Sequence, residues 1–376
     1  MFRGEIMKSK LYLLLTLLFL TLMLLTACSF GEEQPAAEKE EITQKKELSE
    51  EELEKEIENI EEEYQEEILE EESYENEEGY ENEEGYEMAS PFTGLGVGTN
   101  YYKRAISASI ENSPAARPQS GLDKAEIVYE FMLEGGITRF LAIFWPQVPE
   151  KIGPIRSARP ALIETSEFYD ALFLHAGASP RGFALLTVND VLHLDQLYKS
   201  QYFWRSSKRL APHNLYSGRE PLTNYLDSLS EKEYQEQFKF LTASIISDFE
   251  EAEKITIDYW GSYSVIYEYD SLDNNYLRFL NDESTPHLVE SDEQLKAKNI
   301  IVQYVKTSTI DDAGRQEIDL KSGGEIKLFR DGIVIEGKWE RLNQKIIYLN
   351  STGDEIEINP GQTWIQVVPN GTDINY

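Results

Sequence analysis

Arginine and histidine side chains gather in one stretch of a chain that is otherwise strongly acidic. Residues 151–179 hold Arg156, Arg159 and His175 beside Gly-Pro, Arg-Pro and Gly-Ala turns, whereas the whole chain of 376 residues carries a formal net charge of −34. A guanidinium group offers planar paired donors that match carboxylate and phosphate groups. The stretch therefore predicts either an anion pocket or a set of arginines paired with nearby carboxylates.

Residues of the same kinds follow turns elsewhere in the chain. Because α/β folds bind ligands where strands end in turns, we expect the candidate ligand-binding residues to be Arg139, Arg156, Arg159, Arg181, Arg205, His213 and Asn214. The alternative is that each arginine pairs with one of the many Asp and Glu residues and serves as a structural clamp. The sequence leaves both interpretations open.

Catalytic chemistry is a second possibility. The candidate catalytic residues are His175 and Glu134, and His213 could also act as acid or base while arginines stabilise developing negative charge. Glu111 and Asp170 are further carboxylates close to these motifs. There is no HExxH pair, no GxSxG elbow and no SxxK motif. We therefore expect no bound metal and no cofactor, and the sequence does not decide whether the protein is an enzyme.

The N-terminus has the pattern of an export signal. Basic residues precede an apolar run from Leu11 to Leu25, followed by Thr26, Ala27 and Cys28. This run is short for a transmembrane helix. Leu25-Thr26-Ala27-Cys28 resembles the lipobox of bacterial lipoproteins, which implies removal of residues 1–27 and diacylation of Cys28. Two acyl chains would anchor the protein stably to the outer face of the cell membrane.

The next segment, residues 28–90, has the composition of a tether. Residues 29–90 contain 27 Glu, no Asp and 4 Lys, and they include a repeated Tyr-Glu-Asn-Glu-Glu-Gly. Mutual repulsion opposes collapse of such a segment, so we expect a disordered acidic linker. The remaining residues, 91–376, carry a net charge of −13, which disfavours nonspecific binding to nucleic acid.

Two patterns of secondary structure divide the rest of the chain. Strands and helices alternate over residues 91–250, with expected helices at 160–169, 181–188 and 221–229, the last with Ser217 and Glu220 spaced as a capping box. Residues 251–376 show alternating apolar and polar residues separated by Gly-containing turns. We expect an α/β (α+β) layered N-terminal domain followed by a mostly antiparallel β C-terminal domain.

Several motifs resemble a known family, the YerB-like lipoproteins of Bacillus-type bacteria. They include Glu134-Gly-Gly-Ile-Thr-Arg-Phe140, Ile152-Gly-Pro-Ile-Arg-Ser-Ala-Arg-Pro160, Ala211-Pro-His-Asn-Leu-Tyr216 and, near the C-terminus, Asn359-Pro-Gly-Gln-Thr-Trp-Ile365. The resemblance implies a two-part lipoprotein ectodomain, and it implies no catalytic residues. Residues 138–156 also resemble, more faintly, the LytR-type wall-polymer phosphotransferases. The aspartates that hold the metal in those enzymes are not evident at the matching positions of this sequence.

Two hypotheses follow from these patterns. The first is a lipid-anchored binding module outside the cytoplasmic membrane, which recognises an anionic or carbohydrate ligand of the envelope or a protein partner. The second is an envelope enzyme that acts on phosphorylated or glycosidic cell-wall precursors.

Overall fold

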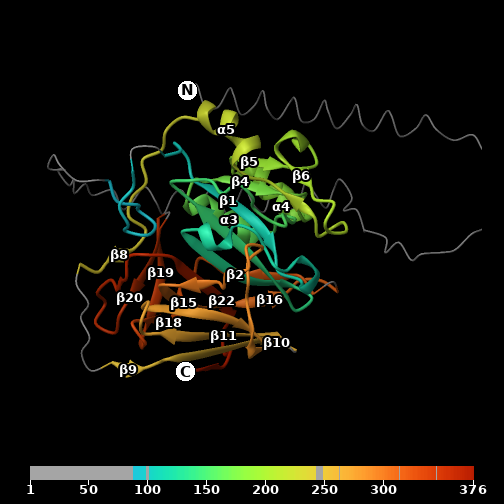
Figure 1. The fold of residues 1–376 in the computed structure, drawn as a ribbon. Coiled ribbons are helices and arrows are strands. Elements are labelled where there is room, and N and C mark those ends of the chain that lie inside the picture. Colours follow the sequence, from blue (N-terminus) through green and yellow to red (C-terminus); the bar gives the residue numbers. More distant parts are fainter. Residues whose placement is uncertain (1–87, 99–100, 243–248, 262, 313, 344) are drawn as a thin grey trace, which may run out of the picture. The chain divides into compact units, whose positions relative to one another are not determined.

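The computed structural model describes residues 88–98, 101–242, 249–261, 263–312, 314–343 and 345–376. The expected export signal, Cys28 and residues 28–87 of the expected linker lie outside the described residues. Figure 1 shows the described part as a layered assembly of strands with a few helices.

A mixed sheet of eleven strands runs through the described part (Figure 1). Ten strands follow the order β20-β19-β18-β15-β22-β2-β3-β1-β4-β5, and β9 pairs with β19. Their bounds are β1 (Ile106–Glu111), β2 (Ile127–Glu134), β3 (Ile137–Phe144), β4 (Leu172–His175), β5 (His193–Asp195), β9 (Glu250–Glu251), β15 (Asn299–Val305), β18 (Gly324–Arg330), β19 (Ile333–Leu342), β20 (Lys345–Leu349) and β22 (Thr363–Pro369).

This sheet contains strands from both halves of the chain. Strand β22 is parallel to both β2 and β15, which joins the end of the chain to its first strands. On the N-terminal side, β1 is parallel to β4 and β4 is parallel to β5. A mixed sheet in the first half and mainly antiparallel strands in the second confirm the predicted fold class.

A second sheet of six strands contains mostly C-terminal residues. Its strands are β10 (Lys254–Trp260), β11 (Tyr263–Asp270), β12 (Asn275–Leu280), β13 (Asp282–Pro286), β14 (Lys296–Ala297) and β23 (Ile374–Asn375). Three two-stranded pairs complete the strands, formed by β16 (Thr307–Thr309) with β17 (Gln316–Ile318), β8 (Lys239–Phe240) with β21 (Glu357–Ile358), and β6 (Trp204–Arg205) with β7 (Leu215–Tyr216).

Three α-helices and three short 3-10 helices occur within the described ranges. They are α3 (Pro160–Phe168), α4 (Pro180–Val188), α5 (Arg219–Ser228), η1 (Pro114–Ala116), η2 (Leu122–Lys124) and η3 (Ser200–Tyr202). Proline at the first position suits α3 and α4, because the missing N–H would have no partner in the first turn. The three predicted α-helices are confirmed to within two residues at each end.

The predicted capping box of α5 is wrong. The N-cap is Gly218, and it makes no side-chain cap. Ser217 instead donates its hydroxyl to Tyr202 O (2.8 Å), and its backbone is bridged to Ile152. A Cβ atom on Gly218 would lie 2.1 Å from Glu150 O, so close approach of the two backbones favours glycine there.

Successive side chains of a strand point to opposite faces of its sheet. The large sheet buries apolar side chains on both of its faces. On β2, Tyr129 and Phe131 join a core with the apolar sides of α3 and α4. Val128 points to the other face, where a second core contains α5 and residues of β10, β11 and β12. Both cores combine residues from the two halves of the chain, so the halves pack as neighbours along the whole sheet.

A buried ion pair joins the two sheets. Glu130 of β2 and Arg278 of β12 have no exposed side-chain surface, and Arg278 Nη2 lies 2.6 Å from Glu130 Oε2. The other oxygen of Glu130 accepts from Thr138 Oγ1 (2.7 Å) and the Tyr263 hydroxyl (2.8 Å). Buried charges are costly unless they are paired and fully hydrogen-bonded, and this pair meets both conditions.

The hydrogen bonds continue from this pair to the end of strand β1. Arg278 Nε donates to His287 Nδ1 (3.0 Å), and His287 Nε2 donates to Gln119 Oε1 (2.9 Å). Gln119 Nε2 in turn donates to the carbonyl of Glu111 (3.0 Å) and to Asn112 Oδ1 (3.1 Å). Burial, with Arg278 alongside, places the pKa of His287 well below its ordinary value, so the ring is neutral.

A buried carboxyl at the start of β2 gives a pH-dependent stability. Burial raises the pKa of Glu126 to about 8, although Ser90 and Thr93 donate to its oxygens. The folded protein therefore keeps this proton between about pH 4.5 and 8, whereas the unfolded chain loses it. Stability conferred by the protonated group is complete below that window and declines as pH rises through it.

We expect Glu126→Gln to remove this decline, because the amide stays neutral. The free energy of unfolding of the variant relative to wild type should increase by up to about 1.4 kcal/mol per pH unit across the window. Urea titrations at pH 5, 6, 7 and 8 measure this difference. A difference that is constant with pH would contradict a protonated Glu126.

Candidate functional site

The candidate site lies at the carboxyl edge of the parallel strands β1 and β4. Arg156 is held there by its backbone, because its N–H donates to Ser109 O (2.8 Å) and its carbonyl accepts from the N–H of Ala176 (3.0 Å). The segment around Arg156 thus lies between the end of β1 and the turn after β4. Ligands of open α/β sheets bind in this position.

Glu134, at the end of β2, is the centre of one group of arginines. Arg159 Nε and Nη2 donate to the two carboxylate oxygens (3.1 and 2.7 Å), and Arg139 Nη2 donates to Oε1 (3.0 Å). Arg139 Nη1 is taken by Ser157 O (2.6 Å). Arg315, which precedes β17, has its Nε 3.9 Å from Glu134 Oε2.

These contacts keep Glu134 ionised. Burial alone would raise the pKa of Glu134, but Arg159 and Arg139 together hold it below its ordinary value. Burial lowers the pKa of Arg139 to about 10, and the neighbouring Arg159 contributes in the same direction. Glu134 is therefore a clamp between guanidinium groups, and it is unsuited to holding a proton for transfer near neutral pH.

Glu111, the last residue of β1, is the centre of a second group. Its Oε1 accepts from Ser113 Oγ (2.8 Å) and lies 3.0 Å from His213 Nδ1 and 3.5 Å from Arg156 Nε. Its Oε2 is buried and has no hydrogen-bond partner within the described residues. The Arg156 side chain is 30% exposed, and its Nε is buried without a hydrogen-bond partner among the described residues.

The two groups form one continuous cluster. Glu111 and Arg139 are direct register partners on β1 and β3, and Arg156 is close enough to Arg139 to lower its pKa. We call the set the arginine cluster, which comprises Glu111, Glu134, Arg139, Arg156, Arg159, His213 and Arg315. With Asp311, which pairs with Arg315 at 2.9 Å, four arginines face three carboxylates and leave one positive charge when His213 is neutral.

The other predicted ligand-binding residues lie outside the cluster. Arg181 Nη1 pairs with Glu317 Oε1 at 2.7 Å, and both side chains are partly exposed. Arg205 Nη1 donates to Asn214 Oδ1 (2.8 Å), and the Asn214 amide donates to two backbone carbonyls of the loop that precedes it. Asp170 pairs with Arg104 at 2.6 Å.

His175 has no exposed surface. Its Nδ1 lies 3.0 Å from Gly177 O, and its Nε2 lies 2.9 Å from His193 Nδ1. A carbonyl can only accept, so Nδ1 of His175 carries the proton and its Nε2 accepts from His193. Burial lowers the pKa of His175 to about 4. Its bonds hold the turn after β4, and its catalytic role remains an untested prediction.

Three residues of the site, Arg315, Asp311 and Ser113, were not among the sequence-based candidates. Arg315 and Asp311 come from the C-terminal half, more than 150 positions after Arg156 in the chain. Their turn reaches the cluster because Glu134, the last residue of β2, forms a backbone bridge to Arg315. The one available signal for Ser113 was its position two residues after the carboxylate that ends β1.

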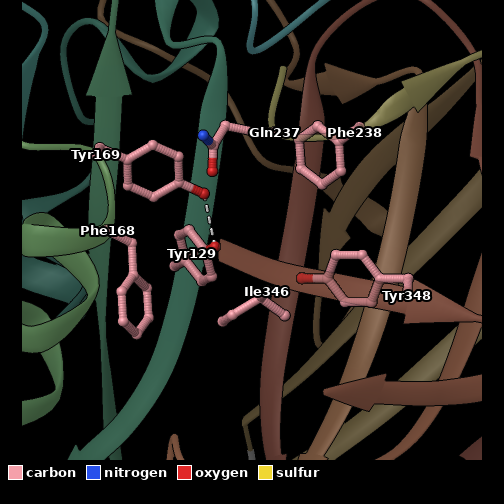
Figure 2. Close-up of a pocket in the computed structure, with 7 residues that line it drawn as sticks. All are labelled: Tyr129, Phe168, Tyr169, Gln237, Phe238, Ile346 and Tyr348. Carbon is pink, nitrogen blue, oxygen red and sulfur yellow. Dashed lines mark hydrogen bonds between the residues drawn. The ribbon is translucent and has the colours of Figure 1, made fainter. Parts of the chain in front are cut away.

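A small cavity lies apart from this cluster (Figure 2). It is lined by Tyr129, Phe168, Tyr169, Gln237, Phe238, Ile346 and Tyr348. The Tyr129 and Tyr169 hydroxyls are hydrogen-bonded to each other at 2.7 Å, as the dashed line in Figure 2 marks. No charged side chain lines the cavity, so it offers no positive charge to an anionic ligand.

Within the described ranges, no three side chains of His, Cys, Asp or Glu gather in a way that could hold a metal ion. No helix within these ranges is long and apolar enough to span a bilayer.

The fold and site thus define a two-part α/β and β protein with an arginine-rich edge. The chain belongs to the DUF3048 family, described as a protein of unknown function, since residues 92–235 match its N-terminal domain and residues 255–365 its C-terminal domain. The chain is 35% identical to the "Putative lipoprotein YerB" of Bacillus subtilis (strain 168) over 289 residues, which covers 75% of this chain and 86% of that protein. The expected YerB-like family is confirmed.

A solved structure gives the same result. The crystal structure of the YerB protein from Bacillus subtilis is 32% identical to this chain, with a TM-score of 0.70. The match covers 77% of this chain and 100% of the crystallised one. The crystallised relative, which corresponds to 77% of this chain, therefore has the same fold.

Replacing Glu134 tests its role as a clamp. We expect Glu134→Ala to lower the free energy of unfolding by about 2 kcal/mol, because it leaves Arg139 and Arg159 largely buried without their partner. The matched control is Glu150→Ala, which removes the 73% exposed partner of Arg219 and should cost less than about 1 kcal/mol. Urea denaturation of both variants gives the comparison, and equal small losses would contradict the clamp.

Proposed function

We propose that the protein is a lipid-anchored binding module of the cell envelope that captures a carboxylate or phosphate ligand at the arginine cluster. The observation that carries this proposal is the Arg156 guanidinium. It is partly exposed, it donates no hydrogen bond within the described residues, and it lies at the ligand-binding edge of an α/β sheet.

The surroundings of Arg156 support an anionic ligand. Arg139 and Arg159 are held in place by Glu134 and by backbone carbonyls, so they supply fixed positive charge beside Arg156. Nε of Arg156 is buried beside Glu111, and the two terminal nitrogens of its guanidinium, which donate no hydrogen bond within the described residues, are the pair that a carboxylate or phosphate would contact. Preorganised charge of this kind lowers the cost of ordering the site when a ligand binds.

The membrane anchor is the second part of the proposal. The relative from Bacillus subtilis carries the name of a lipoprotein, and in this chain Cys28 directly follows the apolar run and Leu25-Thr26-Ala27. We propose diacylation of Cys28 and display on the outer face of the cell membrane. Residues 29–90, with their 27 Glu, would then hold the folded part away from the anchor.

A second candidate function rests on the Glu111–His213 pair. A carboxylate 3.0 Å from His213 Nδ1 orients the imidazole, which leaves Nε2 for acid or base work beside Arg156. This arrangement suits hydrolysis of a phosphorylated or glycosidic wall precursor. We prefer the binding function, because the partly exposed Arg156 can bind a carboxylate or phosphate ligand without the acid or base that catalysis would also need.

Removal of Arg156 tests the binding proposal. Using inorganic pyrophosphate and glucuronate as probes in calorimetric titrations, we expect Arg156→Ala to weaken binding of the preferred probe by about 10- to 100-fold, the effect of losing a charge-assisted pair. Arg104→Ala is the matched control, because Arg104 pairs with Asp170 outside the cluster.

Equal binding by the wild type and Arg156→Ala would remove the proposal. Product analysis of the same mixtures separates the two candidate functions. Hydrolysis of pyrophosphate that is lost in His213→Ala would favour the enzyme.

Replacement of Cys28 tests the anchor. We expect Cys28→Ala to incorporate no labelled fatty acid and to be released from membranes or to remain an unprocessed precursor, because its sulfur is the only thiol in the chain. Fractionation of cells after labelling measures both outcomes. Equal incorporation of label in wild type and variant would contradict acylation at Cys28.

A further inference from the structure

One segment of this acidic chain is positively charged. Residues 196–219 contain Lys199, Arg205, Lys208, Arg209 and Arg219 and no Asp or Glu, in a chain with 69 acidic and 35 basic residues. Lys199, Arg205 and Lys208 are exposed and form no ion pair within the described residues. Arg209 differs, because its Nη2 donates to Pro118 O and its Nη1 is buried. The charges of Lys199, Arg205 and Lys208 therefore remain available to a partner.

The same segment exposes large apolar side chains. Of the twelve large hydrophobic residues exposed in the described part, four lie within these residues: Leu197 (61% exposed), Tyr198 (75%), Trp204 (36%) and Leu210 (85%). Single exposed apolar residues are normal, but their concentration in a basic segment is a mark of an interaction surface. We call residues 196–219 the basic apolar loop.

Residues 205–214 of the loop are held in a fixed conformation. Asn214 is buried, and its amide donates to the carbonyls of Ser206 (3.1 Å) and Arg209 (3.2 Å). Arg205 donates to the other end of the same side chain, and Lys208 N–H donates to Ser206 Oγ (3.2 Å). These bonds close the loop around Asn214 while Leu210 stays exposed.

The chemistry of the loop distinguishes between anionic partners. Unpaired lysines and arginines would attract any polyanion. Contact with the hydroxyl or phosphate groups of a soluble polymer, however, does not stabilise an exposed leucine side chain. Transfer of that side chain from water into hydrocarbon lowers its free energy. Tryptophan and tyrosine beside basic residues are typical of the interface between membrane and water.

We propose that the basic apolar loop docks the folded part on an anionic phospholipid bilayer, with Leu197, Tyr198, Trp204 and Leu210 at the headgroup level and with Lys199, Arg205 and Lys208 facing lipid phosphates. The loop contains His213 of the arginine cluster, but the inference uses no residue of that cluster and does not depend on acylation at Cys28. The loop would set the orientation of the folded part on the membrane, in addition to any anchor.

The test uses the chain from Ser29, which lacks the acyl group and retains all described residues. Cosedimentation is measured with vesicles of phosphatidylcholine alone and with vesicles that also contain phosphatidylglycerol. We expect binding at least tenfold stronger to the anionic vesicles at low salt, with a loss on raising the salt concentration.

Paired variants separate the two contributions. Lys199→Gln and Lys208→Gln should each weaken vesicle binding about fivefold, and Leu210→Ser about tenfold. The matched controls are Leu272→Ser, which replaces a leucine 94% exposed in the turn between β11 and β12, and Lys296→Gln, which lies on β14. Both controls should bind within twofold of wild type.

The outcomes are distinguishable. No preference for anionic vesicles, or binding that Leu210→Ser leaves unchanged, overturns membrane docking. Competition by soluble polyphosphate together with insensitivity to Leu210→Ser would assign the loop to a soluble polyanion and also overturn it. Leu210→Ser should keep the pyrophosphate affinity of wild type, so failure of this proposal leaves the arginine cluster unaffected.

Discussion

The buried pair of Glu130 and Arg278 is the interaction on which the rest of the structure depends. It joins strand β2 to strand β12 with both side chains fully buried. Such a pair stabilises the fold only while all its donors and acceptors are satisfied, and here Thr138, Tyr263, Tyr267 and His287 satisfy them. The two halves of the chain are thus fixed relative to each other by polar contacts within an apolar interface.

The buried Glu130–Arg278 pair also positions the arginine cluster. Through His287 and Gln119, the pair holds the backbone of Glu111, whose carboxylate orients His213 and approaches Arg156. The cluster also needs Arg315 from the C-terminal half. A site built from both halves therefore requires a rigid junction, and the buried network supplies one. In the basic apolar loop, Asn214 adds local bonds to Ser206 and Arg209, while His213 of the same loop contacts Glu111 of the cluster.

Much of the fold could be predicted from the sequence because alternation and proline positions are local signals. Helix α3 begins at Pro160 as predicted, and α4 begins at Pro180, one residue before the predicted start. The parallel pairing of β22 with β2 could not be predicted, because it joins strands more than 200 residues apart. Arg139, Arg156 and Arg159 were all predicted from the sequence as candidate ligand-binding residues. The sequence could not show that Glu134 binds Arg139 and Arg159, whereas the Arg156 guanidinium donates no hydrogen bond within the described residues. That distinction depends on which carboxylate each guanidinium reaches.

The most direct test is a double-mutant cycle between Glu130→Gln and Arg278→Met, measured by urea denaturation. If the pair and its network hold the halves together, each single variant should lose about 3–5 kcal/mol of unfolding free energy, and the double variant should lose much less than the sum of the two. Additive losses, with a coupling energy near zero, would contradict the dependence of the structure on this interaction.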